Sequence, residues 1–252
     1  MYWLTIVGFF IAVLVVSLGG GGGMAYVGIL VACFGIPPEI AASTSLATII
    51  PTTLVGTISH IKQKNIRYNY LYMMIPGGII GVVAGTFLMH GINPSVARKI
   101  FGIALILLTI PMFLSVFKIN VKSKKKQSKY KHEDLLKSII FGLMAGLMTG
   151  ALGLSGTAPV ILGLISLGCS ALEVIGTSLA VIFVLSIAGF LTHLSVGSID
   201  WKIIGWLLAG TIPGALVSPL LLKMIKKETL EKFATPLLII IILASGILLL
   251  IK

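Results

Sequence analysis

Long apolar runs constrain the fold of this chain more than any other feature of its sequence. Runs such as Ile100–Phe117 and Ala234–Ile251 contain no charged residue. Each is close to the ~20 residues that an α-helix needs to cross a bilayer, and neither alternates as the strands of membrane barrels do. Only 10% of the 252 residues are charged, against about 25% in soluble domains. The sequence therefore predicts an all-α polytopic membrane protein.

The positive charge of the chain is concentrated beside the apolar runs. The net charge is +12, and seven lysines lie within Lys118–Lys131. Basic loops between membrane helices mark the cytoplasmic side, so we interpret the charge as topological and expect no nucleic-acid partner. The first 20 residues have no basic start and no small-residue cleavage site, which indicates a retained first helix rather than a signal peptide.

An internal repeat organises the sequence. When the chain is shifted by 133 residues, Ile40–His60 aligns on Glu173–His193 without a gap, and "TSLA" meets "TSLA". Glycines also coincide: Gly20, Gly23, Gly35, Gly56, Gly77 and Gly81 meet Gly153, Gly156, Gly168, Gly189, Gly210 and Gly214. Chance similarity between apolar segments does not explain matched Gly, Ser, Thr and His residues. We expect a first transmembrane repeat at 1–117, a basic cytoplasmic linker at 118–134 and a second repeat at 135–252.

Each repeat contains five apolar segments, and the second of them is short. The segments are expected at 2–18, 24–34, 39–60, 69–90 and 97–117, and again at 136–152, 157–167, 172–194, 201–222 and 233–251. Five crossings per repeat give two copies of inverted topology, as in many secondary transporters. Both termini are then external, and the lysine-free loop Ser195–Asp200 is also outside. Arg98 and Lys99 are a mild exception, and a re-entrant rather than crossing path for 24–34 and 157–167 stays an alternative.

Glycine-rich breaks precede both short segments. Eleven helical residues rise only about 17 Å, against about 30 Å of hydrocarbon, so irregular backbone must complete the path. Such backbone is tolerated at membrane depth only where protein or water satisfies it. Helix N-termini offer free N–H groups to an anion. The predicted substrate-binding residues at the breaks are Gly21, Gly22, Gly23, Ser155, Gly156 and Thr157, with Ser155 or Thr157 also expected to cap the following helix. The alternative is that these glycines only allow close helix packing.

Paired hydroxyl residues form a second group of candidates. Thr44 and Ser45 recur as Thr177 and Ser178, and their hydroxyls can donate to a small oxyanion. They can equally bond a carbonyl of their own helix, as membrane Ser and Thr residues often do. Because the pair is present in both copies, we favour binding.

Titratable residues in the apolar segments are few. His60 and His193 occupy equivalent positions near segment ends, where an interfacial histidine is the favoured interpretation and proton coupling the alternative. Glu39 and Glu173 each begin a third segment and are expected to act as N-terminal helix acids. Two cysteines, Cys33 and Cys169, have no metal-ligand spacing. We expect no metal and no cofactor.

The chain resembles the sulfite exporter TauE/SafE family, also called the 4-toluene sulfonate uptake permease family. The resemblance rests on "GGGGGMAYVGILVACFGIPPEIAASTSLATI", on "GTISHIKQKNIRYNYLYMMIPGGIIGVVAGTFL" and on "GLSGTAPVILGLISLGCSALEVIGTSLAVI", and it covers nearly the whole chain. It implies a multi-pass inner-membrane protein that moves a small inorganic or organic sulfur oxyanion by secondary transport. The second copy dilutes the glycine run to "GLSGT", so the two halves of a site need not contribute equally.

Other functions fit the sequence less well. There is no nucleotide-binding loop, no HExxH and no GxSxG, and we therefore expect no enzyme. A passive anion channel of the same architecture is the main alternative, because it would share the chemistry of the helix termini. A membrane scaffold without transport does not account for the paired breaks. A homo-oligomer is compatible with the sequence.

Overall fold

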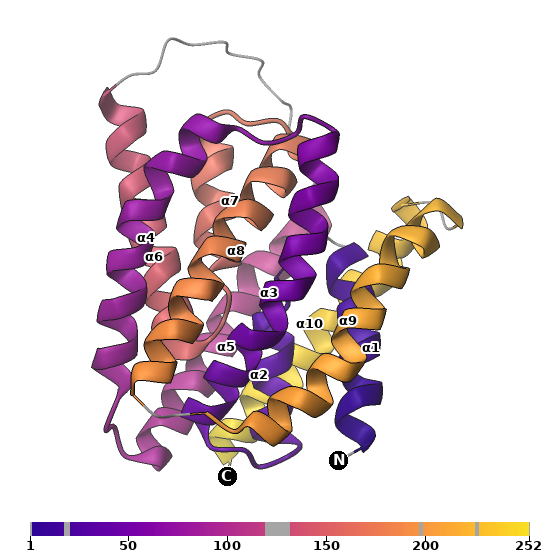
Figure 1. Ribbon diagram of the computed structural model, residues 1–252. Coiled ribbons are helices and arrows are strands. Elements are labelled where there is room, and N and C mark those ends of the chain that lie inside the picture. The colour runs from indigo at the N-terminus through magenta and orange to yellow at the C-terminus, as the bar shows by residue number, and fades with distance from the viewer. Residues whose placement is uncertain (1, 18–20, 119–131, 197–198, 225–226, 252) are drawn as a thin grey trace.

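The chain folds into a helical bundle in the computed structural model, which describes residues 2–17, 21–118, 132–196, 199–224 and 227–251 (Figure 1). These residues form ten α-helices and no strand, which confirms the predicted all-α fold. The helices are α1 (Tyr2–Ser17), α2 (Gly23–Ala32), α3 (Pro38–Lys62), α4 (Tyr68–Met89), α5 (Pro94–Lys118), α6 (His132–Leu152), α7 (Thr157–Ser166), α8 (Ala171–Ser195), α9 (Trp201–Met224) and α10 (Lys227–Ile251).

Five helices of the described part are long and apolar enough to cross a membrane. They are the spans Pro38–Lys62, Tyr68–Met89, Glu133–Leu152, Leu172–Ser195 and Trp201–Ser218. By contrast, α2 and α7 have ten residues each, in agreement with the short second segments that the sequence predicted. Ten residues rise about 15 Å, so neither helix spans the hydrocarbon layer by itself.

Helices of the first half pack on helices of the second half in reciprocal pairs. The pairs are α1 with α9, α4 with α6, α3 with α8, and α5 with α10. In repeat terms, the first segment of each copy lies on the fourth segment of the other copy, and the third and fifth segments each pair with their counterparts. Figure 1 shows α4 and α6 at one side of the bundle and α1 and α9 at the other, with α3 and α8 between them. The two halves are therefore interlocked rather than side-by-side domains.

Glycines set the closeness of the outer pairs. Gly77 and Gly81 on α4 face the backbone carbonyls of Ile139 and Leu143 on α6, leaving no room for a side chain. The equivalent Gly210 on α9 faces the carbonyl of Thr5 on α1 in the same way. Small residues let membrane helices approach at backbone distance, so these repeated glycines are packing residues.

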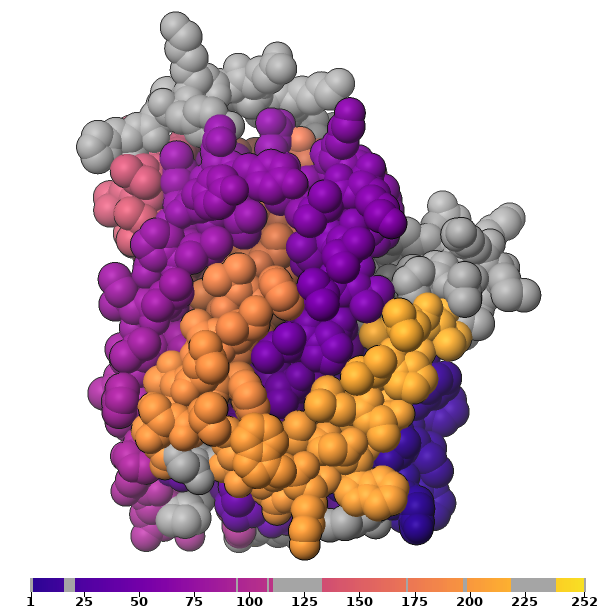
Figure 2. Space-filling view, viewed as in Figure 1, coloured from indigo at the N-terminus to yellow at the C-terminus, as the bar shows by residue number. Residues whose placement is uncertain are grey.

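The ends of the bundle are distinct. The start of α1 and the end of α10 lie at one end, and the start of α6 lies at the opposite end (Figure 1). Figure 2 shows α4, α8, α3 and α9 together forming one face of the molecule. Many large apolar side chains of the bundle are exposed, among them Tyr72, Ile80, Leu88, Leu191, Leu216 and Ile240. An apolar exterior suits a lipid environment.

Candidate functional site

Two helix interruptions are present where the glycine-rich sequences predicted them. Helix α1 ends at Ser17 before α2 begins at Gly23, and α6 ends at Leu152 before α7 begins at Thr157. The residue before each short helix is a glycine in the left-handed region, Gly22 with φ 74° and Gly156 with φ 56°. Residues with a side chain rarely adopt this backbone conformation, which explains why both breaks need glycine here.

The two interruptions touch each other inside the bundle. A Cβ atom placed on Gly23 would lie 2.7 Å from the carbonyl oxygen of Gly153 and 2.8 Å from the amide nitrogen of Ser155. One placed on Gly21 would lie 2.9 Å from the Cβ of Ser155. Gly21, Gly23, Gly153 and Ser155 are all buried. We call this contact between 21–23 and 153–157 the break junction.

Ser45 of α3 joins the two sides of the break junction. Its hydroxyl donates to the carbonyl oxygen of Gly153 at 2.9 Å and lies 3.4 Å from the carbonyl oxygen of Gly23. The side chain is fully buried. The carbonyl of Gly153 lies just after the end of α6, where carbonyls lack a helical partner, so Ser45 satisfies backbone of the second break while it also contacts backbone of the first.

The capping expected of Ser155 or Thr157 is wrong. The cap of α7 is Gly156, and no side chain caps the helix. Ser155, at φ 62°, instead pairs with Thr157 through their two hydroxyl oxygens at 2.8 Å. Because two hydroxyls bonded to each other leave one proton for a third partner, this pair can still donate into the junction.

The equivalent hydroxyl pairs have different surroundings. Thr177 accepts the amide N–H of Arg67 at 2.9 Å, and Ser178 donates to the carbonyl of Ile175 on its own helix at 3.0 Å. Thr44 is fully buried, and its hydroxyl has no hydrogen-bond partner among the described residues. The structure therefore brings Gly21, Gly23, Ser45 and Ser155 together, with Gly22, Gly156 and Thr157 adjoining them. It gives Thr177 and Ser178 contacts away from the junction.

Further polar side chains of the interior were missed at the sequence level. Thr48 and Thr52 are buried on the same face of α3 as the predicted Thr44, and their hydroxyls bond carbonyls of their own helix. Tyr26 and Ser186 are also buried, and their hydroxyls have no partner in the part of the chain that the structure describes. A spacing of four residues places side chains on one helix face, so the threonine series was a signal available in the sequence.

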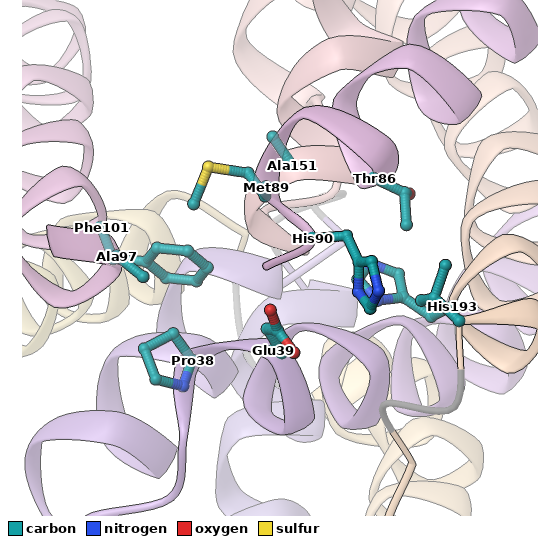
Figure 3. A pocket seen from close by; sticks show the side chains of 10 residues that line it. Pro38, Glu39, Thr86, Met89, His90, Ala97, Phe101, Ala151 and His193 are labelled. Carbon is teal, nitrogen blue, oxygen red and sulfur yellow. The ribbon is translucent and has the colours of Figure 1, made fainter. Parts of the chain in front are cut away.

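A pocket opens at the end of the bundle where α3 begins and where α4 and α8 end (Figure 3). Its polar lining residues are Glu39, Thr86, His90 and His193, and its other walls are apolar. His193 is 4% exposed, whereas its counterpart His60 is only partly buried and lies 3.3 Å from the Asn65 side chain. The two equivalent histidines thus occupy different environments.

The two candidate helix acids differ in the same way. Glu173 accepts the N–H of Ser170 in a capping box at the start of α8, which confirms its N-terminal role. It also forms an ion pair with Arg67 at 2.8 Å. Glu39 lies in the first turn of α3, as expected, and lines the pocket with the two histidines.

Comparison with known proteins agrees with the architecture. The family profile described as "Sulfite exporter TauE/SafE" matches residues 4–245. Probable membrane transporter protein YdhB of Bacillus subtilis is 29% identical over 92% of this chain and 96% of its own length. YtnM of the same organism, also named a probable membrane transporter, is 32% identical over 83% of this chain and 71% of its own.

A similar protein also occurs in an archaeon. Probable membrane transporter protein MJ0441 of Methanocaldococcus jannaschii is 29% identical over 77% of this chain and 73% of its own length. No solved structure matches the chain. With a family match along nearly the whole sequence and a helical bundle interrupted at its two glycine-rich breaks, the chain belongs to the sulfite exporter TauE/SafE family of membrane transporters.

Proposed function

We propose that this protein is a secondary transporter that moves a small sulfur-containing anion, such as sulfite or a sulfonate, across the cell membrane by alternating access. The observation that carries the proposal is the break junction. The two helix interruptions meet at this buried junction, and the N-termini of α2 and α7 lie there. Helix N-termini carry partial positive charge and free amides, which suit an oxyanion.

The chemistry of the junction favours an anion over a cation. Among the described residues, the polar groups there are backbone amides and carbonyls and the hydroxyls of Ser45, Ser155 and Thr157, with no carboxylate among them. A site without Lys or Arg binds an anion weakly enough to release it, as turnover requires. The partner implied is a small sulfur oxyanion in a lipid bilayer, and the family description supports this class.

The described conformation is closed at the junction. Gly23 and Gly153 approach too closely for even a methyl group between them, so a bound anion requires the two breaks to separate. The reciprocal helix pairs suggest how this occurs: in an inverted repeat, rocking one half against the other exposes the same junction to either side. In this proposal the 118–134 linker is cytoplasmic and both termini are external.

Flux measurements test the proposal. Protein reconstituted in liposomes is supplied with sulfite, sulfate, thiosulfate or an organosulfonate, with and without an imposed proton gradient, and should accumulate at least one of them against its own gradient when a driving gradient is imposed. Accumulation identifies a carrier, whereas flux that only dissipates the gradient identifies the passive anion channel. No movement of any of these anions would contradict the proposal.

Thr44→Val is the most direct test of the binding residues. Because the buried hydroxyl of Thr44 has no partner within the described ranges, valine replaces it without breaking any hydrogen bond seen there. If the hydroxyl donates to the anion, the KM of transport should rise about tenfold while the melting temperature is retained. The matched control is Thr53→Val on the same helix, whose hydroxyl bonds Ile49 at 2.7 Å and should leave KM near the wild-type value. An unchanged KM in Thr44→Val would remove this residue from the site.

A further inference from the structure

The pocket at the terminal end of the bundle contains titratable groups that extend from solvent into the interior. Glu39 comes from α3, His90 from the end of α4 and His193 from α8 (Figure 3). His90 is exposed, Glu39 is partly buried and His193 is buried. The walls from α5 and α6 are Ala97, Phe101 and Ala151, so Glu39 and His90 are the titratable groups that face His193.

The hydrogen bond of His193 fixes which of its nitrogens can titrate. Its Nε2 lies 3.0 Å from the carbonyl oxygen of Gly150, which can only accept, so Nε2 carries a proton. Its Nδ1 is buried and has no partner among the described residues. A proton can therefore bind at Nδ1 without breaking the bond to Gly150, and the cation would then face Glu39.

This bond ends on the helix that precedes the second break. Gly150 lies in the last turn of α6, where carbonyls have no helical partner because the helix stops at Leu152. The hydroxyl of Thr86 also reaches this carbonyl, at 3.2 Å. A positive charge at a helix C-terminus is favourable, so protonated His193 should hold the end of α6 more firmly than neutral His193.

We propose that Glu39, His90 and His193 form a proton-binding site, and that a proton bound there stabilises the second break through the bond between His193 and Gly150. The inference deepens the proposed transport function and rests on it, because it supplies a place where a proton gradient can act on the break junction. His90 connects the site to solvent, and Glu39 stabilises the bound charge.

The described residues of the first copy form no equivalent site, which makes the arrangement one-sided. His60, the counterpart of His193, lies beside Asn65 in the loop after α3. The groups at that end are different: Glu173 is paired with Arg67 rather than with a histidine. A proton can therefore act on the junction from one end of the bundle only.

Hydrogen exchange tests the inference without needing a transported solute. The purified protein in detergent is exchanged at a series of pH values between about 5 and 8, where histidine titrates, and the rates are corrected for the intrinsic effect of pH. Amides of 153–158 should be about tenfold more protected at the acidic end. His193→Gln keeps an N–H donor for Gly150 but cannot titrate, so its protection should not vary with pH.

Two further variants complete the test. His60→Gln is the matched control and should keep the wild-type profile. Glu39→Gln should move the midpoint downward by about one pH unit, because the neighbouring negative charge is lost. This shift remains measurable if His193→Gln fails to fold.

The outcomes decide between the inferences. Three results would each overturn the proton site: protection of the 153–158 amides that does not change with pH in the wild type, protection that still changes with pH in His193→Gln, or an unchanged midpoint of this pH dependence in Glu39→Gln. Transport of the anions in liposomes is measured separately. If exchange behaves as expected but no anion is transported, the proton site stands and the transport function fails.

Discussion

Glycine serves two separate purposes among the residues of this chain. Along α4, α6 and α9 it lets helices approach to backbone distance, as at Gly77 and Gly210. At the break junction it admits the backbone of the other copy, and Gly22 and Gly156 add a left-handed conformation. The two purposes are indistinguishable in composition, because both appear as glycine in apolar surroundings. They differ in whether the helix continues.

Gly23→Ala should destabilise the protein through the junction. The new Cβ would meet backbone atoms at 2.7 Å, and these cannot move aside by rotamer changes. We expect a loss of about 1–3 kcal/mol, seen as a lower melting temperature in detergent, together with reduced flux. Gly205→Ala is the control, since nothing lies within 4 Å of its added methyl group. Equal melting temperatures in the two variants would show that the junction is looser than described.

At the scale of elements, the loop between α3 and α4 is anchored on the start of α8. Arg67 contributes its side chain to the ion pair with Glu173 and its backbone N–H to Thr177. Gly176 packs against the carbonyl of Asn65: a Cβ atom placed on Gly176 would lie 2.7 Å from that carbonyl oxygen. The helix start and the loop therefore support each other, and Thr177 has a structural contact here whatever its part in binding.

The capping of α8 should matter more than the ion pair. Arg67 and Glu173 are 47% and 24% exposed, so solvent screens their attraction and Arg67→Ala should cost less than about 1 kcal/mol. Glu173→Ala also removes the acceptor for the N–H of Ser170 and should cost about 1 kcal/mol more. Thermal unfolding of both single variants and the double variant measures the difference. A larger effect from Arg67→Ala would reverse this ranking.

At the scale of the whole molecule, the reciprocal pairing of helices is the feature that relates fold to transport. The two short helices pack differently: α2 packs on α10 of the other half as well as on α3, whereas α7 packs mainly on α6 and α8 of its own half. The junction draws on both halves. Separating the halves would expose the same glycine backbone to one side or the other.

Cysteine labelling checks the orientation proposed for the molecule. Cys33 is exposed after α2, so a membrane-impermeant maleimide should modify it in intact cells. Ser195→Cys, at the end of α8, should react from the same side, and Gln63→Cys only after permeabilisation. Cys169 should stay unmodified throughout, because burial, assisted by the charge of Glu173, raises the pKa of its thiol to about 11. Reaction of Gln63→Cys from outside would invert the topology.

The sequence by itself determined the elements of this protein. Apolar length fixed the helices, and the glycine-rich runs fixed both interruptions, because these are local properties of backbone and solvent. Only the tertiary structure decided which candidates share a site. It joined Ser45 to both breaks, turned Thr177 toward the loop at Arg67, and separated buried His193 from His60. Repeated sequence gives two residues the same local conformation, but their partners come from the other half of the chain, where the two copies differ.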